Sequence, residues 1–180
     1  MALAKTIQKH DDVGDHGFRA VESSKMATLL SSLVFNKLHP LDQVCSQETV
    51  TVLSADRTTV TLTLPGFRSY SRLTWPQTIR SYRLALLIAQ LSDFVWSEAD
   101  NGYKPLVAGV QNRSVLVYTD WRKTSTEPEE IVLSASFAEP ALQKPGTTVL
   151  SVLAIEISTG NAAQTPSVSP GTMKIVACFT

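Results

Sequence analysis

Strict alternation of two kinds of residue over positions 59–64 limits the fold of this chain more than any other feature. The segment reads Thr-Val-Thr-Leu-Thr-Leu, so threonine fills every second position and valine or leucine fills the others. Successive side chains of a β-strand point to opposite faces, and β-branched threonine suits the exposed one. The run 49–52, Thr-Val-Thr-Val, repeats the pattern, and residues 55–57 form a polar link between the runs. We therefore predict a β-hairpin with one apolar face, ended by Pro65-Gly66.

The composition extends this interpretation to the whole chain. A length of 180 residues suits one domain, or one domain plus an arm. Charged residues make up 18% of the chain, below the roughly 25% of an average soluble domain, and 19 serines and 19 threonines make up the difference. The 16 basic and 16 acidic residues cancel, which argues against a polybasic nucleic-acid binder. No apolar run is long enough to cross a membrane, so no membrane contact is expected.

Further alternating or apolar segments follow, separated by loops that contain proline and glycine. Ile79–Leu91 is rich in Ala and Leu, which also allows a helix, but its neighbours favour a long central strand. Ser97–Pro105 is expected to be a polar loop. The other predicted strands are Leu106–Val110, Ser114–Thr119, Ile131–Phe137, Thr148–Ser158 and Thr172–Phe179.

About eight strands after residue 44 predict an all-β fold, an eight-stranded jelly-roll β-sandwich of two facing sheets. The alternative is an immunoglobulin-like sandwich, which usually carries a Cys pair with a Trp between its members. Cys45 and Cys178 are too far apart in sequence for that pattern. We expect both to be reduced thiols.

The N-terminal region differs from the rest of the chain. Residues 1–22 are polar and mixed in charge, which predicts a flexible N-terminal arm ahead of a single domain over 23–180. Over 24–38, apolar residues recur at spacings of three and four, which predicts one short helix. Ser23 or Ser24 can cap its start, and Pro40 ends it. A strand over Ser32–Leu38 is the competing interpretation.

Catalytic motifs are not found. The densest polar cluster holds His10, Asp12 and His16, whose side chains are plausible ligands of a divalent ion. The cluster lies in the predicted arm, and a catalytic metal needs a rigid frame. We therefore predict a protein that is not an enzyme and that uses no metal or other cofactor. A hydrolase or metalloenzyme centred on His10 and His16 is kept as a third hypothesis.

The placement of arginine is the most informative charge pattern. Seven of the eight arginines lie between Arg57 and Arg122, and residues 57–123 hold nine basic and four acidic residues, a net charge of +5. Arginines in this stretch alternate with Tyr70, Trp75 and Tyr82. Such a mixture can contact RNA backbone and bases, and the same residue types are enriched at subunit interfaces. The residues predicted to contact RNA or a neighbouring subunit are Arg68, Arg72, Arg80, Arg83, Arg113 and Arg122.

The C-terminus resembles a known family. A long apolar strand, Thr148-Val-Leu-Ser-Val-Leu-Ala-Ile-Glu-Ile-Ser158, precedes a small-residue loop and a last strand that ends in Cys178-Phe179. This arrangement, over about the last 35 residues, is similar to the ends of coat proteins of small icosahedral plant RNA viruses and their satellites. Many such coats carry a basic arm, whereas residues 1–25 here are charge-balanced, as in the coats of tymoviruses.

The resemblance implies a structural coat protein that assembles with copies of itself into an icosahedral shell around a viral RNA genome. Its expected location is the virion, and the host cytoplasm during assembly. The helix over 24–38 is expected to pack under the shell or against a neighbour. The alternative is a non-catalytic β-sandwich binding module, such as a viral accessory or lectin-like protein.

Overall fold

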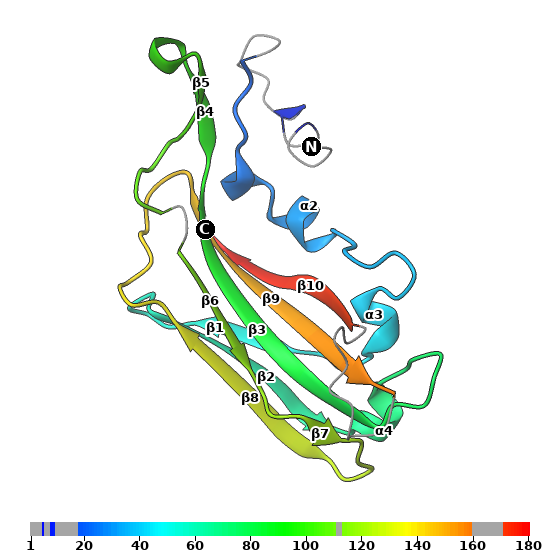
Figure 1. Ribbon diagram of the computed structural model, residues 1–180. Coiled ribbons are helices and arrows are strands. Elements are labelled where there is room, and N and C mark those ends of the chain that lie inside the picture. Colours follow the sequence, from blue (N-terminus) through cyan, green and yellow to red (C-terminus); the bar gives the residue numbers. More distant parts are fainter. Residues whose placement is uncertain (1–4, 6–7, 10–17, 111–112, 160–170) are drawn as a thin grey trace.

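Two antiparallel sheets face each other in the computed structural model, which describes residues 5, 8–9, 18–110, 113–159 and 171–180 (Figure 1). The first sheet has the order β1-β2-β8, and the second has the order β10-β9-β3-β6 with β7 also paired to β3. A separate ribbon, β4-β5, extends beyond one end of the sandwich. The strands are β1 Val50–Leu53, β2 Thr59–Phe67, β3 Ser81–Ser92, β4 Phe94–Ser97, β5 Gly102–Pro105, β6 Ser114–Tyr118, β7 Arg122–Lys123, β8 Glu129–Ser136, β9 Thr147–Ser158 and β10 Gly171–Phe179. The predicted all-β sandwich is confirmed.

The predicted hairpin is formed by β1 and β2. Val50 pairs with Thr63 and Leu53 pairs with Val60, so the valines of β1 lie beside the threonines of β2. The polar link turns the chain with Arg57 at a positive φ of 57°. The predicted end at Pro65-Gly66 is wrong, because β2 continues to Phe67. An irregularity in the β2–β8 register between Leu64 and Phe67, with Gly66 at a φ of 56°, admits the proline into the strand.

The core lies between the two sheets. Leu62 and Leu64 of β2 and Leu84 and Leu86 of β3 are fully buried there. β3 lies between β9 and β6, so the prediction of a long central strand over Ile79–Leu91 is confirmed. Its near-continuous apolar sequence follows from full burial of its inner face and partial burial of its outer face.

The N-terminal segment covers part of the outer face of the second sheet, over β9 and β10. It forms a 3-10 turn η1 (Ser23–Lys25) and two short helices, α2 (Ala27–Ser31) and α3 (Leu41–Val44), which lie beside β10 (Figure 1). Leu30 of α2 packs with Leu150, Val152 and Ile175 in a second apolar cluster. The segment therefore packs on its own domain.

The helix predicted over 24–38 is wrong in extent, and the strand alternative over Ser32–Leu38 is wrong as well. The α-helix ends at Ser31, and residues 32–40 form no regular structure. The Asn36 side chain accepts hydrogen bonds from the backbone N–H groups of Leu38 and His39 and thereby turns the chain. Val34, Phe35 and Leu38, which completed the helical pattern, are exposed.

Two strand predictions are also corrected. Leu106–Val110 is not a strand, and the expected loop Ser97–Pro105 contains β5. Trp96 of β4 pairs with Tyr103 of β5, and the turn between them places Asn101 at a φ of 48° before Gly102. With the ribbon and the two-residue β7, the described residues form ten strands, where about eight were expected.

The jelly-roll connectivity is not confirmed. β1 and β10, the first and last strands, lie in different sheets. The chain passes from β2 in the first sheet to β3 in the second, returns to the first as β8, and crosses back as β9. The short helix α4 (Ser69–Arg72) lies in the first of these crossings, and the described residues of the other two contain no helix longer than one turn.

Residues 18–22, at the end of the predicted arm, lie against the ribbon. Val21 forms a β-bridge with Phe94, and the centres of the Phe18 and Trp96 rings are 5.0 Å apart. The predicted boundary at residue 22 thus falls inside a segment that contacts the domain. None of the described helices is long and apolar enough to cross a membrane.

Candidate interaction surfaces

The six predicted arginines do not form one patch. Arg68 and Arg72 are exposed at either end of α4 (Ser69–Arg72), at the end of the sandwich where β3 begins. Arg80 precedes β3 at the same end, and Arg83 lies on the outer face of that strand. Arg113 lies at the opposite end of the sandwich, where its carbonyl accepts a hydrogen bond from the backbone of Gln90.

Three of the six arginines are bound to carboxylates of this chain. Arg83 pairs with Glu156 at 2.7 Å, and Arg113 pairs with Glu139 at 3.0 Å. Arg122 pairs with Glu129, also at 2.7 Å. These contacts neutralise three of the six predicted arginines. The excess positive charge of residues 57–123 therefore does not form one continuous basic surface.

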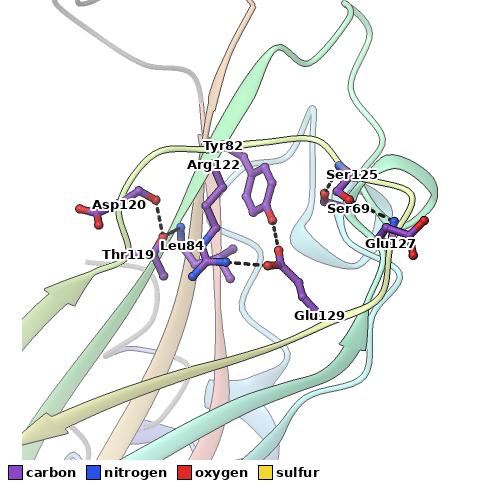
Figure 2. Close-up of polar contacts among 9 residues, drawn as sticks. All are labelled: Ser69, Tyr82, Leu84, Thr119, Asp120, Arg122, Ser125, Glu127 and Glu129. Atoms are coloured by element: carbon purple, nitrogen blue, oxygen red, sulfur yellow. Dashed lines mark hydrogen bonds and ion pairs between the residues drawn. The ribbon is translucent and has the colours of Figure 1, made fainter.

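Arg122 belongs to a hydrogen-bond network that supports the fold (Figure 2). Its Nη1 donates to Glu129 Oε2 at 2.7 Å, and the Tyr82 hydroxyl donates to Glu129 Oε1 at 3.0 Å. Ser69 Oγ accepts from the backbone N–H of Ser125 at 2.9 Å. Burial raises the pKa of Tyr82 to about 12, with the neighbouring Glu129 acting in the same direction. The network ties α4 and the segment after β7 to β3 and β8, and its tyrosine is fully buried.

Arg83, one of the six arginines predicted to contact RNA or a neighbouring subunit, lies beside two aromatic rings on the surface. Its guanidinium carbon lies 4.4 Å from the centre of the Tyr118 ring and 5.1 Å from that of Trp121. Sequence reasoning missed both aromatics and named others. Tyr82 is buried in the core, and Trp75 packs against that core with its ring 4.4 Å from His39.

The signal for Tyr118 was present in the sequence. Over 114–118, Ser, Leu and Tyr alternate with two valines that pack against the core. Leu116 and Tyr118 therefore point outward, and they are 49% and 46% exposed. Trp121 follows the strand, and no periodicity places it on either face.

A hollow of about 470 Å³ lies on the same outer face of the second sheet. Phe35 and Leu38 form one wall, and Ala154, Glu156 and Met173 belong to the sheet. Leu38 is 83% exposed. The hollow is open and mainly apolar, with the carboxylate that holds Arg83 at its border.

A second hollow, of about 550 Å³, lies between the residues before β1 and the edge strand β10. Asp42 and Lys174 pair there at 2.7 Å. Cys45 lies in its wall, and burial raises the pKa of this thiol. Cys178 is also a free thiol, in the second apolar cluster with a pKa raised by burial.

Metal-binding chemistry has no support within the part of the chain that the structure describes. No group of three His, Cys, Asp or Glu side chains there could hold a metal ion. His10, Asp12 and His16 lie outside the described residues.

The outer face of the first sheet carries few charged residues, because Glu129 and Glu130 are the only ones within its three strands. Val50, Thr63 and Val132 form one cross-strand row, and the next row joins Val52 and Thr61 to a serine. Val50 is 54% exposed, Val52 is 55% exposed and Val132 is 52% exposed. This face combines exposed apolar side chains with hydroxyl groups.

Comparison with protein-family models, with curated proteins and with solved structures found no match to this chain. The surfaces are therefore interpreted from their own chemistry.

Proposed function

We propose that this protein is a non-catalytic structural subunit that binds copies of itself. The specific form of the proposal is the coat protein of a small icosahedral RNA virus, which the C-terminal resemblance implies. The observation that best supports self-association is that exposed apolar side chains lie on both outer faces of the sandwich. Val50 and Val132 lie on one face, and Leu116, Tyr118 and Met173 lie on the other.

Two apolar faces on opposite sides support assembly more than simple pairing. A subunit with one such face can form only a dimer, because the contact with one partner covers that face completely. A subunit with two different faces can contact two neighbours, and repeated contacts of this kind close into rings or shells. Ordinary monomers carry scattered exposed apolar residues, but here Val50, Val52 and Val132 share one sheet face, and Leu116, Tyr118 and Met173 share the other.

The strand order refines the fold. We infer an immunoglobulin-like connectivity, because β1-β2-β8 and β10-β9-β3 follow the order A-B-E and G-F-C, with β6 added beside the third strand. The missing Cys pair, which argued against this alternative in the sequence, is replaced by aliphatic core contacts. The assembly proposal accordingly rests on surfaces and not on a jelly-roll connectivity.

Contact with viral RNA is assigned to one end of the sandwich. Arg68, Arg72 and Arg80 are exposed there, and no described carboxylate forms an ion pair with Arg68 or Arg72. Exposed arginines can bind phosphate through paired N–H groups. The other three predicted arginines bind carboxylates of the chain and are assigned to the fold.

The second candidate is a binding module that acts as a monomer or small oligomer, either a viral accessory or a lectin-like protein. It is favoured by the hollow of about 470 Å³ beside Met173. In this case the apolar wall formed by Phe35 and Leu38 holds a ligand instead of a neighbouring subunit.

Size-exclusion chromatography with light scattering, read at 260 and 280 nm, tests the proposal. Assemblies far above the 19.6 kDa of one chain support the structural subunit. A raised 260/280 ratio supports the coat form, and Arg68→Glu with Arg72→Glu should lower this ratio without dissolving the assembly. Lys144→Glu, at an exposed lysine elsewhere, is the control for a charge reversal outside this end of the sandwich. A monomer at every concentration and salt condition contradicts assembly and favours the binding module.

A further inference from the structure

We propose that the outer face of β1, β2 and β8 is where two copies of this chain pack back to back, related by a twofold axis. This proposal rests on the proposed function, because it presumes self-association, and it names the face and the partner. We call the outward side chains of these three strands the hydroxyl-valine face. Its central row is Val52, Thr61 and Ser134.

The middle of the hydroxyl-valine face carries no charged side chain. Within the three strands, charged residues occur only at the first two positions of β8, Glu129 and Glu130. A twofold contact brings residues near the axis close to their own equivalents. A charged side chain there would meet its own like charge, and no such charge lies in the middle of the hydroxyl-valine face. The face is therefore compatible with a second copy of itself.

Removing water from the hydroxyl groups of this face costs little free energy, because they are already paired. A hydroxyl that loses water without a new partner costs free energy. Here the Thr59 and Ser136 hydroxyls are 2.8 Å apart, and those of Thr61 and Ser134 are 3.2 Å apart. Each pair hydrogen-bonds across neighbouring strands, so these hydroxyls keep a partner when a second sheet covers them.

The two outer faces of the sandwich differ in how far the N-terminal segment covers them. The outer face of the second sheet carries Leu150, Val152 and Ile175, and the N-terminal segment covers them. No described segment covers Val52 or Val132, which stay more than half exposed. None of the segments that the structure describes supplies a partner for this face, and one sheet can pack face to face on another at the usual spacing of about 10 Å.

The area of the face sets the strength of the contact. Three strands about 4.8 Å apart, and roughly seven residues long at about 3.3 Å each, cover on the order of 330 Å². A stable interface buries roughly 800 Å² on each partner. The pair alone is therefore expected to be weak, and the other apolar face must contribute before large assemblies persist.

Charge insertion tests the face. Val132→Lys places a lysine at a position 52% exposed, and Leu116→Lys places one at a position 49% exposed on the opposite outer face. Sedimentation velocity measures self-association over a roughly hundredfold range of concentration. The Val132→Lys chain should self-associate at least about tenfold more weakly than the parent, while Leu116→Lys leaves the first, pairwise step unchanged. Circular dichroism checks that both variants fold.

A crosslink distinguishes a second copy from a different partner surface. Thr61→Cys copies should be joined by a short bifunctional maleimide, and Ser114→Cys copies, with the cysteine on β6, should not. Weakening by Leu116→Lys alone, or failure of Thr61→Cys to crosslink in an associating sample, overturns the face and leaves the proposed function standing. A parent chain that stays monomeric throughout overturns both.

Discussion

Asp93 anchors the N-terminal segment to the sandwich, and its replacement gives the sharpest test of the fold. The residue lies between β3 and β4 and is only 3% exposed. Its Oδ1 accepts hydrogen bonds from Ser23 Oγ at 3.0 Å and from the Ser24 N–H at 2.8 Å, and its Oδ2 accepts from Ser24 Oγ at 2.6 Å. Asp93→Ala removes all three acceptor contacts.

The cost follows from which donors lose a partner. Ser23 is buried, so its hydroxyl stays unpaired, at about 1.5–3 kcal/mol for a bond to a charged group. Ser24 is half-buried, so water replaces much of what its two donors lose. Removing the carboxylate also removes the cost of burying its charge. We expect a net loss of about 2–3 kcal/mol in the free energy of unfolding.

Urea denaturation measures the loss. With a denaturant slope of about 2 kcal/mol/M, the midpoint of Asp93→Ala should fall by about 1–1.5 M. Trypsin should also cut faster after the exposed Lys25, because η1 is released from the sheet. Asp42→Ala, which breaks the exposed pair with Lys174, should change stability by no more than about 0.5 kcal/mol. A loss below about 1 kcal/mol for Asp93→Ala, or an unchanged cleavage rate, would refute the anchoring role.

Three further predictions concern the core and the thiols. Since the pKa of Tyr82 rises from 10.0 to about 12 on folding, the folded state keeps a proton that the unfolded state loses, so stability falls as pH rises from 10 to 12. Tyr82→Phe should flatten this fall in alkaline urea titrations and cost about 1 kcal/mol at neutral pH, because Glu129 loses a donor. Leu30→Ala should cost about 2–3 kcal/mol by leaving a cavity in the second apolar cluster, measured by thermal denaturation with a control at an exposed leucine. Cys178 should react with a thiol reagent faster than Cys45 in the native protein, because Cys45 is buried and Cys178 is partly accessible; equal rates contradict the placement.

The sequence predicted strands best where one face meets the core and the other stays uncovered. The runs around Val52 and Val132 alternate because their outer faces are open, and both were placed correctly. β3 and β9 lost the alternation because their outer faces are also partly covered, so periodicity alone left β3 open to a helix. The helix over 24–38 was overextended, because its spacing was read without the turn that Asn36 makes.

The connectivity could not be predicted, because periodicity assigns a face to each residue and not a neighbour to each strand. The same limit applies to the surface. The interleaving of Arg83 with aromatics was visible in the sequence, but its ring partners, Tyr118 and Trp121, lie far along the chain on other elements. The acids that neutralise Arg113 and Arg122 come from another loop and another strand. A local count of charge cannot reveal such pairs.

The contrast between the two sheets links the first sequence feature to the proposed function. A protein surface that meets only water usually carries many charged residues, which also oppose association between folded chains. The outer residues of β2 are instead Thr59, Thr61 and Thr63, which are small and uncharged. Threonine keeps this face soluble in the free chain, and its paired hydroxyls lower the cost of covering it. Strict alternation of apolar and polar residues, with no charged residue among them, is therefore the pattern expected of a surface that is exposed in the monomer and covered in an assembly.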